Sequence, residues 1–350
     1  MSETTMTTVN PGTAVTGAVE ATDELPREAV DAVVIGGGAA GLNGALMLAR
    51  SRRAVVVIDS GTPRNAPADG VHGLLGLDGT PPAELLRRGR AEVRGYGGLV
   101  VNGEVASAAP AAPSAEGDPR FVVTLTDGST LSARRLLIAT GLRDVLPGVP
   151  GLAEHWGHGV VHCPYCHGWE VRDEPIGILA VGPASVHHAL LFRQLTDDLV
   201  YFTRGTDLDE GTRARFAARG IRVVDTPVTE VVAAEEGGVA GVRLRDGDLV
   251  PRRVLAVATT MQARTEGLAE LALPMDDLPG GMGRHFVTGA AGVTEVPGVW
   301  VAGNATDLAA QVGASAAAGA LAGARMNADL AAADTEAALA AAQGDAVTRA

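Results

Sequence analysis

The sequence predicts an α/β fold with two Rossmann-like nucleotide-binding domains of the three-layer ββα type, the second inserted in the first. Two patterns predict this fold. Residues 31–60 have the order strand, glycine turn, helix and strand, and residues 176–205 repeat that order later in the chain. Strands that alternate with helical segments are typical of parallel sheets with crossover helices.

The first unit, "DAVVIGGGAAGLNGALMLARSRRAVVVIDS", carries a dinucleotide-binding pattern. "AVVI" is a short apolar strand, and Gly36, Gly38 and Gly41 form a G-x-G-x-x-G turn before a helical pattern. Gly36 permits the tight turn, Gly38 lets a pyrophosphate approach the backbone, and Gly41 allows close packing of helix and strand. The second strand ends in Asp59, 18 residues after Gly41, where an acid can hold a ribose hydroxyl.

The later elements predict one nucleotide-binding fold interrupted by another. Residues 120–141 alternate like a hairpin with an Asp-Gly turn and end in the apolar strand "RLLIATG". Near residue 150, "LPGVPGL" indicates a crossover linker. The remaining strand and helix patterns lie at 176–195, 199–205, 254–260 and 296–331.

Composition and charge exclude several classes of protein. The chain has 350 residues and a formal net charge of −13, whereas nucleic-acid phosphates and anionic lipids bind clustered Lys and Arg. No stretch is typical of a membrane span, and residues 308–324 are expected to form a buried helix of small residues. Residues 1–29 lack the features of a signal peptide and are expected to be a disordered tail, and residues 331–350 an Ala-rich tail. We therefore expect a cytoplasmic protein with no nucleic-acid or membrane partner.

The segment "HCPYCH" contains the only two cysteines of the chain, Cys163 and Cys166, with His162 and His167 on either side. A zinc site, a structural disulfide or a redox centre could use this spacing. Zinc usually needs a second pair of ligands, and the chain has no second CxxC. A disulfide over two intervening residues closes too small a loop to stabilise much. In a reducing cytosol, a single CxxC is more often catalytic or metal-binding than structural.

The order of these parts resembles the low-molecular-weight thioredoxin reductase family of FAD-dependent pyridine-nucleotide-disulfide oxidoreductases, over residues 30–330. The motifs that carry the resemblance are "GGGAAG", "ATG" at 139–141, "CPYCHG" and "GVWVAGNATD…QVGASAAAG". Within the family, "CPYCHG" is most similar to dithiol oxidases of natural-product pathways, such as those of gliotoxin and holomycin. The resemblance implies a homodimer and a discontinuous FAD-binding domain at 30–147 and 262–330. It also implies an NAD(P)-binding-like domain at 148–261 that carries the CxxC.

By the same resemblance, Cys166 is the sulfur nearer the flavin and Cys163 exchanges with the substrate. Either task needs a thiolate, so a base must lie close. His167 occupies the family's acid/base position, and an imidazole with an ordinary pKa of about 6.5 can accept and return a proton at neutral pH. His162 could assist from the other side. The resemblance implies FAD contacts from Gly36, Gly38, Ala39, Ala40, Gly41, Asp59, Ser60, Arg64, Asn65, His72, Val105, Ala139, Thr140, Gly141, Gly303, Asn304, Gln311 and Val312.

Other histidines and tryptophans near these motifs are assigned no chemistry. We interpret His187 and His188 as surface or helix filler, and Trp156 and Trp169 as core or interface packing.

Three positions depart from the family pattern. His167 replaces the Asp that the reductases carry after the second cysteine. Asn304 replaces the Asp of the late FAD segment, and Asn can still hydrogen-bond a ribityl or phosphate oxygen. The turn of the insert, "VGPASVHHA", has Gly182 as its one clear match, and "TRG" at 203–205 has one arginine where the family has a His-Arg-Arg group. Such a turn holds the phosphates of NADPH weakly, which makes NADPH a doubtful cofactor.

Three functions remain open. The first is a FAD-dependent oxidase that forms a disulfide in a small-molecule dithiol and passes the electrons to O2, giving H2O2. The second is an NADPH-dependent reductase of thioredoxin or another disulfide, with a thioredoxin-like protein as partner. The third is a regulatory flavoprotein without fast turnover. The weak NADPH turn beside intact FAD and CxxC motifs favours the first.

Overall fold

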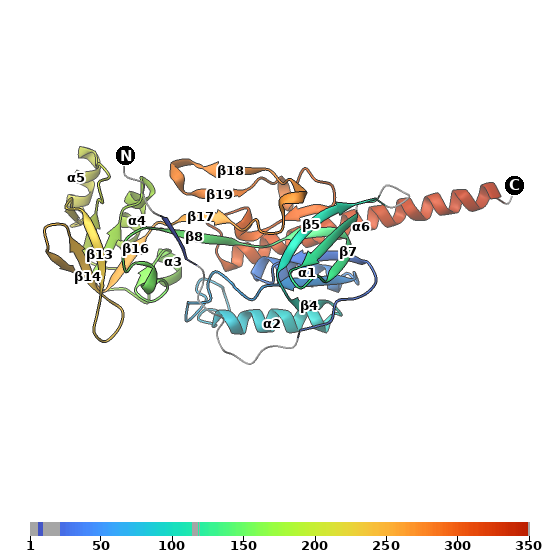
Figure 1. The fold of residues 1–350 in the computed structure, drawn as a ribbon, viewed down its shortest axis with the longest axis horizontal. Coiled ribbons are helices and arrows are strands. Elements are labelled where there is room, and N and C mark those ends of the chain that lie inside the picture. Colours follow the sequence, from blue (N-terminus) through green and yellow to red (C-terminus); the bar gives the residue numbers. More distant parts are fainter. Residues whose placement is uncertain (1–5, 10–21, 114–117, 119, 349–350) are drawn as a thin grey trace.

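The computed structural model of the chain describes residues 6–9, 22–113, 118 and 120–348, and Figure 1 shows two bodies along its long axis. The first body holds a seven-stranded sheet in the order β4-β3-β2-β7-β6-β5, with β20 beside β7. The second, the insert, holds a five-stranded sheet in the order β12-β11-β10-β16-β9. The central strand pairs of both sheets are parallel, which confirms the predicted α/β class.

The first body owes its core to strands of Val, Ile and Leu that are buried on both faces, as parallel strands covered by helices require. Its Gly-rich helices pack closely, because a Cβ on Gly323 of α6 would lie 2.5 Å from the carbonyl oxygen of Gly44 on α1. The helix of small residues predicted over 308–324 thus begins at Val312, and one of its faces is buried while Leu321 on another is exposed. The elements are β2 (Val30–Ile35), α1 (Ala39–Arg50), β3 (Val55–Asp59), α2 (Pro82–Gly95), β4 (Leu99–Asn102), β5 (Val105–Ala111), β6 (Arg120–Leu125), β7 (Thr130–Ile138), β20 (Val299–Val301) and α6 (Val312–Thr348).

The insert repeats this plan on a smaller scale. Its central strands β10, β11 and β16 are buried along their whole length, and a three-stranded hairpin sheet lies beside them. The elements are β9 (Val160–Val161), α3 (Pro164–His167), β10 (Ile176–Leu179), α4 (Ala184–Phe192), β11 (Leu199–Phe202), α5 (Glu210–Ala218), β12 (Arg222–Val224), β13 (Val228–Ala233), β14 (Val239–Leu244), β15 (Leu249–Pro251) and β16 (Val254–Val257).

Two neighbouring strands connect the bodies. β8 (Leu142–Pro147) leads into the insert and pairs antiparallel with β17 (Thr260–Ala263), which leads out of it. β17 also pairs with β19 (Gly283–Phe286), the partner of β18 (Met275–Leu278). We propose that the two bodies are the predicted domains, divided at the end of β8 and within β17. Short 3₁₀ turns cover Ala153–His155, Ala269–Leu271, Pro279–Gly281, Ala290–Gly292 and Gly303–Ala305.

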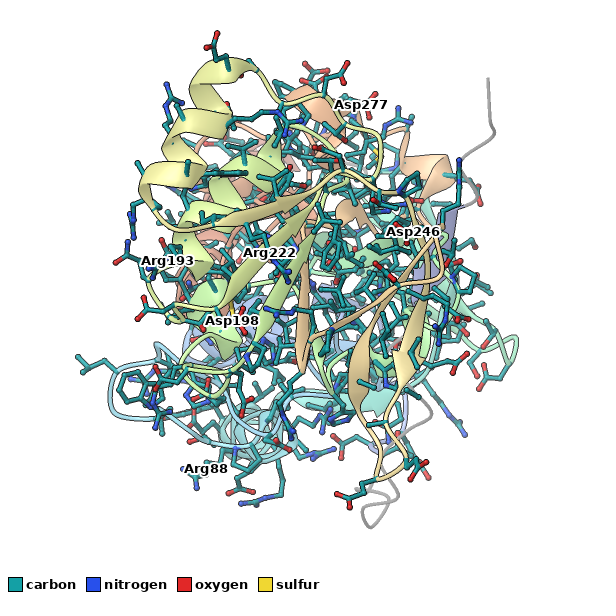
Figure 2. All side chains as sticks on the ribbon, turned by 90° about the vertical axis from the view of Figure 1, so that its left-hand side faces the viewer. Arg88, Arg193, Asp198, Arg222, Asp246 and Asp277 are labelled. Atoms are coloured by element: carbon teal, nitrogen blue, oxygen red, sulfur yellow. A yellow bond between two sulfur atoms is a disulfide. The ribbon has the colours of Figure 1, made fainter. Side chains whose placement is uncertain are left out.

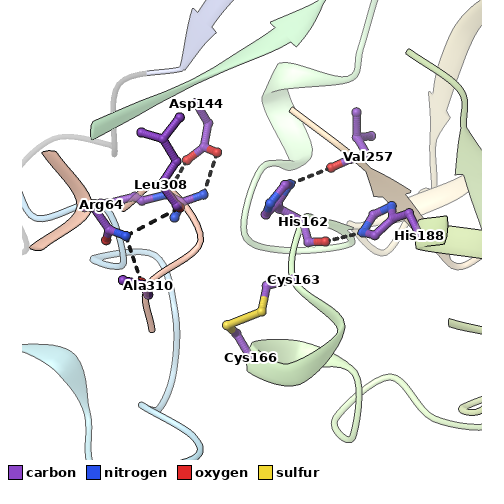
Figure 3. Close-up of a disulfide and its surroundings, with 10 residues drawn as sticks. Arg64, Asp144, His162, Cys163, Cys166, His188, Val257, Leu308 and Ala310 are labelled. Atoms are coloured by element: carbon purple, nitrogen blue, oxygen red, sulfur yellow. Dashed lines mark hydrogen bonds and ion pairs between the residues drawn. A yellow bond between two sulfur atoms is a disulfide. The ribbon is translucent and has the colours of Figure 1, made fainter. Parts of the chain in front are cut away.

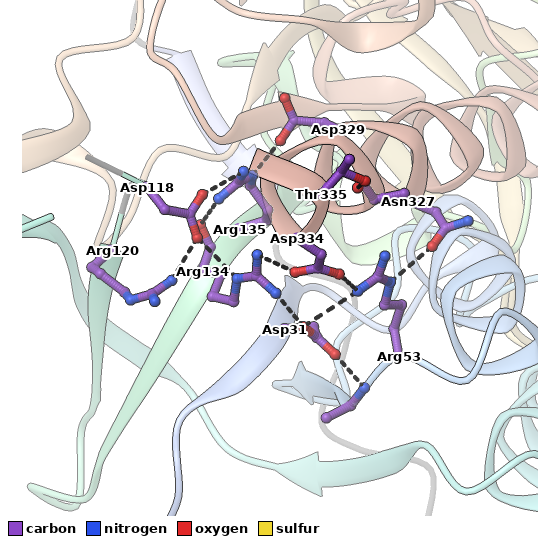
Figure 4. A network of polar contacts seen from close by, with 12 residues as sticks. Asp31, Arg53, Asp118, Arg120, Arg134, Arg135, Asn327, Asp329, Asp334 and Thr335 are labelled. Carbon is purple, nitrogen blue, oxygen red and sulfur yellow. Dashed lines mark hydrogen bonds and ion pairs between the residues drawn. The ribbon is translucent and has the colours of Figure 1, made fainter. Parts of the chain in front are cut away.

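The Ala-rich C-terminal segment continues helix α6. α6 runs to Thr348, and residues 349–350 lie outside the described residues. Figure 4 shows what holds the helix beyond residue 330: Asp334 accepts hydrogen bonds from Arg53 at 2.6 Å and pairs with Arg134 at 2.7 Å. Arg53 also donates to the Asn327 side chain at 2.9 Å. These contacts from the first body explain why the Ala-rich segment stays helical.

The prediction of a disordered tail over residues 1–29 is wrong for the part that the structure describes. Met6–Val9 form strand β1, antiparallel to β8. Asp23 accepts hydrogen bonds from the Val100 N–H at 2.7 Å and from Arg94 at 2.9 Å, which ties the segment before β2 to the edge strand β4. Residues 1–5 and 10–21 lie outside the described residues.

The far end of the insert has charged side chains of both signs, and Figure 2 labels Arg193, Asp198 and Arg222 there. Asp198 is paired, since Arg252 donates to its carboxylate at 2.6 Å. Within the described ranges, no helix combines the length and the apolar character that crossing a membrane would require.

Candidate redox site

The motif "CPYCHG" folds as one tight turn that brings the two sulfurs together, and Cys163 and Cys166 form a disulfide (Figure 3). Cys163 is the residue before α3, and the N–H groups of Cys166 and His167 both donate to its carbonyl oxygen at 3.2 Å. Pro164 supplies the fixed φ that a helix start needs. At Gly168 a Cβ would lie 2.1 Å from the Pro164 carbonyl oxygen, so the turn requires glycine there.

His167 has the properties of a buried base next to Cys166. Both of its ring nitrogens are buried and have no hydrogen-bond partner among the described residues. Burial lowers the pKa of His167, although the nearby carboxylate of Glu170 acts in the opposite direction. The imidazole is therefore neutral at neutral pH and has a nitrogen available to take a proton.

His162 is an anchor of the cysteine turn. Its Nδ1 lies 3.0 Å from the Val257 carbonyl oxygen (Figure 3). The Thr259 nitrogen lies 3.2 Å from the same Nδ1. Burial lowers the pKa of His162, and the charge of Arg64 adds to this effect. Its Nδ1 is engaged with β16 and the residues after it, so His162 positions the turn, and a role as a second base would fall to Nε2.

The interpretation of His188 as filler is wrong. This side chain on α4 is 7% exposed, and its Nε2 forms a hydrogen bond with the carbonyl oxygen of His162, directly before Cys163 (Figure 3). The ring packs edge-on against Phe192, with 4.9 Å between the ring centres. Burial lowers the pKa of His188 to about 4, so the ring is neutral and holds α4 against the cysteine turn. His187 is exposed, as expected of filler.

The two tryptophans differ in their surroundings. Trp156 packs against the core of the insert, as predicted. Trp169 does not lie in the core: it is 67% exposed, and the Arg172 guanidinium lies over its ring at 4.2 Å.

A buried ion pair lies where the bodies meet. Arg64 donates to Asp144 on β8 through Nε at 2.6 Å and Nη2 at 2.7 Å (Figure 3). The Thr259 hydroxyl donates to the same carboxylate at 2.6 Å. Thr259 also contacts His162, so this chain of contacts reaches the residue before Cys163. The predicted cofactor residue Arg64 thus has a structural partner that the sequence did not indicate.

The glycine turn of the first body has the geometry of a dinucleotide cradle. Gly36 has φ +105°, and a Cβ there would lie 2.3 Å from the Ala139 carbonyl oxygen. A Cβ on Gly41 would lie 1.8 Å from the Gly36 carbonyl oxygen. A Cβ on Gly38 would meet no atom within 4 Å, so the space before the N-terminus of α1 is open. Ala39 and Ala40 begin that twelve-residue helix, whose N-terminus favours a phosphate.

Asp59 lies at this turn, as the pattern predicts, and has a partner that the pattern did not reveal. Its carboxylate would lie 2.7 Å from a Cβ on Gly37. It accepts hydrogen bonds from Arg90 of α2 at 3.0 Å and from the Gly61 N–H at 3.3 Å. Carboxylate oxygens have further lone pairs, so Asp59 can still accept a ribose hydroxyl.

The end of β7 forms another wall of the cradle. Thr140 donates to the carbonyl oxygen of Arg264 at 2.8 Å, and Gly141 has φ +70°. Arg264 itself donates to the Thr62 hydroxyl at 3.1 Å, and its Nε is buried without a partner among the described residues. Arg264 is a candidate cofactor contact that the sequence did not indicate.

The segment around Gly303 lies against the glycine turn of the first body. A Cβ on Gly303, which has φ +77°, would lie 2.7 Å from the Cβ of Ala40. The Ser315 hydroxyl lies 3.8 Å from that position and is buried without a partner in the described part of the chain. Val312 begins α6, and the Gln311 carbonyl accepts from the Ser315 N–H at 2.9 Å. An unpaired buried hydroxyl beside an open glycine turn fits a bound FAD.

Asn304 has a narrower role than predicted. Its Nδ2 donates to the carbonyl oxygens of Ala310 at 2.8 Å and Asp307 at 3.0 Å, so it organises its own loop. The remaining Oδ1 is an acceptor, which can bind a ribityl hydroxyl but not a phosphate oxygen.

Four further predicted residues lie at the edges of the site. The Ser60 hydroxyl is 3.1 Å from that of Thr62, and the Asn65 carbonyl accepts from the Ala68 N–H at 3.0 Å. The side chain of Val105 belongs to the hydrophobic core. His72 lies between two carboxylates, Asp78 at 3.3 Å from Nδ1 and Glu170 at 3.4 Å from Nε2.

The turn of the insert does not fit a second dinucleotide. The Val181 N–H donates to the Ser185 hydroxyl at 3.0 Å, and Pro183, the residue before α4, has no N–H to offer. Arg204 donates to the Ala180 carbonyl oxygen at 2.9 Å. A Cβ on Gly182 would lie 3.7 Å from the carbonyl oxygen of Gly280, in the turn between β18 and β19. Groups that would face a pyrophosphate are thus bonded within the chain.

Comparison with known proteins agrees with this geometry. The family model described as pyridine nucleotide-disulphide oxidoreductase matches residues 30–324. Thioredoxin reductase tcpT of Claviceps purpurea (strain 20.1) is 36% identical over 250 residues, which are 69% of this chain and 77% of that protein. Thioredoxin reductase sirT of Leptosphaeria maculans is 34% identical over 231 residues, 62% and 70% of the two chains.

Two solved structures share the fold over most of their length. The crystal structure of HlmI has a TM-score of 0.84 and 42% identity, and the match covers 93% of this chain and 99% of that one. The oxidoreductase from Agrobacterium tumefaciens has a TM-score of 0.79 and 32% identity, and its match covers 87% and 99%.

Proposed function

As a member of the pyridine nucleotide-disulphide oxidoreductase family, this chain is an enzyme that acts on disulfides and dithiols, and we propose that it is a FAD-dependent dithiol oxidase. In the proposed reaction a small-molecule dithiol and O2 become a disulfide and H2O2. Members of the family bind FAD, and the open cradle at Gly38 and the unpaired Ser315 hydroxyl fit that cofactor.

The observation that carries the choice of an oxidase is the turn of the insert, where nearby donors are bonded within the chain. A reductase must accept a hydride from NADPH, so it needs a phosphate-binding turn in its second domain. Here Ser185 and Ala180 take the nearby donors, and Gly280 lies over Gly182. A turn that holds NADPH weakly supports the proposal that electrons reach the cofactor through the disulfide.

The cysteine turn supports a two-step exchange. A substrate thiolate attacks Cys163 Sγ, the Cys163–Cys166 bond breaks, and Cys166 leaves as a thiolate. The second substrate thiolate attacks the substrate sulfur of this mixed disulfide, which releases the product disulfide and the Cys163 thiolate. Two electrons now reside on the cysteine pair. FAD, when bound, supplies the two-electron acceptor that restores the disulfide and passes the electrons to O2.

His167 handles the protons of this exchange. Each substrate thiol must lose a proton before it attacks, because the thiol form is a poor nucleophile. The neutral ring of His167, with both nitrogens unpaired, can accept that proton and later release it towards the peroxide product. His162 and His188 hold the turn in place while the sulfurs exchange.

Aerobic assays with purified yellow protein test the proposal. A panel of small dithiols without any nicotinamide should give H2O2 and the product disulfide in equal amounts, and Cys163→Ser should give neither. Absence of peroxide with every dithiol rejects the oxidase. If the flavin also reacts slowly with every dithiol, the regulatory flavoprotein replaces it.

The names of two relatives favour a second candidate, an NADPH-dependent thioredoxin or disulfide reductase. Anaerobic NADPH should then bleach the flavin at a rate that supports turnover, with a thioredoxin-like protein as acceptor. The oxidase proposal expects no such bleaching. We also propose a cytoplasmic homodimer, from the acidic composition and the resemblance, which light scattering and cell fractionation would test.

A further inference from the structure

A cleft of about 620 Å³ opens at the cysteine turn. Its walls come from the loop before α2 and from the residues within and just after the CxxC, namely His72, Gly73, Asp78, Tyr165, Trp169 and Glu170. Tyr165, which stands between the two cysteines in the sequence, lines this cleft, so the cleft adjoins the cysteine turn. The volume is in the range of small-molecule sites.

One wall of the cleft is aromatic. Tyr165 is 64% exposed and Trp169 is 67% exposed, which is unusual for large aromatic side chains in a chain with few of them. Arg172 holds the Trp169 ring through its position over the ring and a hydrogen bond to the Trp169 carbonyl oxygen at 2.7 Å. A flat organic body can cover these rings.

The acidic wall of the cleft consists of Asp78 and Glu170. Asp78 and Glu170 lie on the two sides of His72, 3.3 Å and 3.4 Å from its ring nitrogens. Asp78 also accepts a hydrogen bond from the Gly73 N–H at 2.8 Å. Both carboxylates remain open to a ligand, with side chains 65% and 42% exposed.

The acidic wall is near the reacting groups. The charges of Glu170 and His72 both affect the pKa of His167, the residue that follows Cys166. Asp78 and Glu170 are the acidic residues among those that line the cleft, and the nearby Arg172 lies over the Trp169 ring. Two aligned carboxylates beside the exchange site attract a cation and repel an anion.

We propose that Asp78 and Glu170 are specificity-determining residues, which select dithiols that carry a basic group and disfavour dithiols that carry a carboxylate. This inference rests on the proposed function, because it assumes that the cleft receives a small dithiol. The substrate class is a small, flat dithiol with an ammonium or similar cation placed a few atoms from its sulfurs.

Matched pairs of dithiols test the inference. Dihydrolipoate differs from dihydrolipoamide by a negative charge, and dithiobutylamine carries an ammonium group where dithiothreitol carries hydroxyls. Because the thiols of dithiobutylamine are also the more acidic, that pair is judged by how its rate ratio changes between variants. The measurement is the second-order rate of flavin reduction by each dithiol without oxygen, so it does not depend on peroxide formation. The wild type should prefer dithiobutylamine to dithiothreitol, and dihydrolipoamide to dihydrolipoate.

Neutral variants of the two acids should weaken these preferences. Asp78→Asn with Glu170→Gln should lower both rate ratios from their wild-type values by roughly two- to five-fold per carboxylate, the scale for partly exposed charges, and should bring the ratio of dihydrolipoamide to dihydrolipoate close to one. Salt should weaken the wild-type preferences in the same direction. Glu170→Gln alone tests the idea if the Asp78 change disturbs its loop, which flavin content and the melting temperature would reveal.

A control variant distinguishes the effect of the cleft carboxylates from the effect of the protein's overall negative charge. Glu235→Gln with Glu236→Gln changes the net charge by the same amount in the exposed turn between β13 and β14. The control should keep the wild-type ratios. Equal ratios in all three proteins, or equal shifts in the control, overturn the inference. Charge-selective flavin reduction without peroxide in air would instead keep the inference and reject the oxidase.

Discussion

Arg64 and Asp144 join the first body to the strand that leads into the insert, through hydrogen bonds of 2.6 and 2.7 Å. Asp144 is 2% exposed, so burial alone would raise its pKa, but the Arg64 guanidinium and the Thr259 hydroxyl bring that pKa below its ordinary value. Since Thr259 lies between β16 and β17, the pair contacts both connections between the bodies. We infer that it holds the cysteine turn in one position relative to the cradle.

The first prediction concerns this pair. Arg64→Met leaves a buried carboxylate without its counter-charge, which should cost about 3 kcal/mol of unfolding free energy. The melting temperature should fall by roughly 5 °C or more. Adding Asp144→Asn should recover part of the loss, because a neutral amide needs no counter-charge. Differential scanning calorimetry measures both changes.

An exposed pair supplies the control. Arg213 and Asp225 are bonded at 3.0 Å, but both side chains are more than two-fifths exposed, at 44% and 58%. Arg213→Met should leave the melting temperature unchanged. An Arg64→Met protein that melts with the wild type would show that the buried pair contributes nothing to stability.

The dinucleotide cradle could be predicted from the sequence because its residues contact others that lie close to them in the sequence. Gly36, Gly41 and Asp59 belong to one strand–turn–helix–strand unit. Position 41 requires glycine because a Cβ there would collide with the carbonyl oxygen of Gly36. The cysteine turn is equally local, with all of its hydrogen bonds between Cys163 and Gly168. Patterns of this length are visible in a single sequence.

The partners of these residues could not be predicted because they come from distant segments. Arg90 lies 31 residues from Asp59, His188 lies 26 from His162, and Thr259 lies 115 from Asp144. No spacing rule connects such positions, since the folded sheets decide which helix faces which strand. The C-terminal helix shows the same limit: its composition indicated a tail, whereas Arg53 supplies a partner 281 residues away.

The second prediction uses the buried His188. Its folded pKa of about 4 lies below the ordinary value of 6.5, so the unfolded chain binds more protons between these pH values. The stability that this group contributes is fully present above pH 6.5 and is lost as the pH falls towards 4. The loss amounts to at most about 3 kcal/mol. The lowered pKa values of His162 and His167 act in the same direction.

A neighbouring histidine gives a matched comparison. His188→Gln removes one of these titrations, so its melting temperature should fall less than that of the wild type between about pH 7.5 and about pH 5. His187→Gln, at the exposed neighbouring position, should keep the wild-type dependence. Identical slopes for all three proteins would contradict a buried neutral ring at position 188.

The third prediction separates cofactor binding from folding. Gly38 has φ −80° and open space before it, so Gly38→Ala should fold normally but lose at least about tenfold in FAD affinity, because the methyl occupies the approach of the pyrophosphate. Gly41→Ala puts a methyl 1.8 Å from the Gly36 carbonyl oxygen and should destabilise the protein even without FAD. Flavin titration and melting of the apoprotein measure the two effects. A Gly38→Ala protein that binds FAD as tightly as the wild type would place the pyrophosphate elsewhere.

The last prediction concerns the roles of Cys163, Cys166 and His167 in the dithiol exchange. Cys163→Ser and Cys166→Ser should each abolish dithiol turnover while FAD stays bound, because neither sulfur belongs to the cradle. His167→Gln keeps the size of the side chain but removes its basic nitrogen, and should slow turnover by about a hundredfold, the usual scale for a lost base. Raising the pH should restore part of this rate, since the substrate thiol then ionises without help. The His187→Gln protein should turn over at the wild-type rate. If His167→Gln keeps its full rate near pH 7, the proton must leave by another route, and the unpaired ring beside Cys166 would have a structural role only.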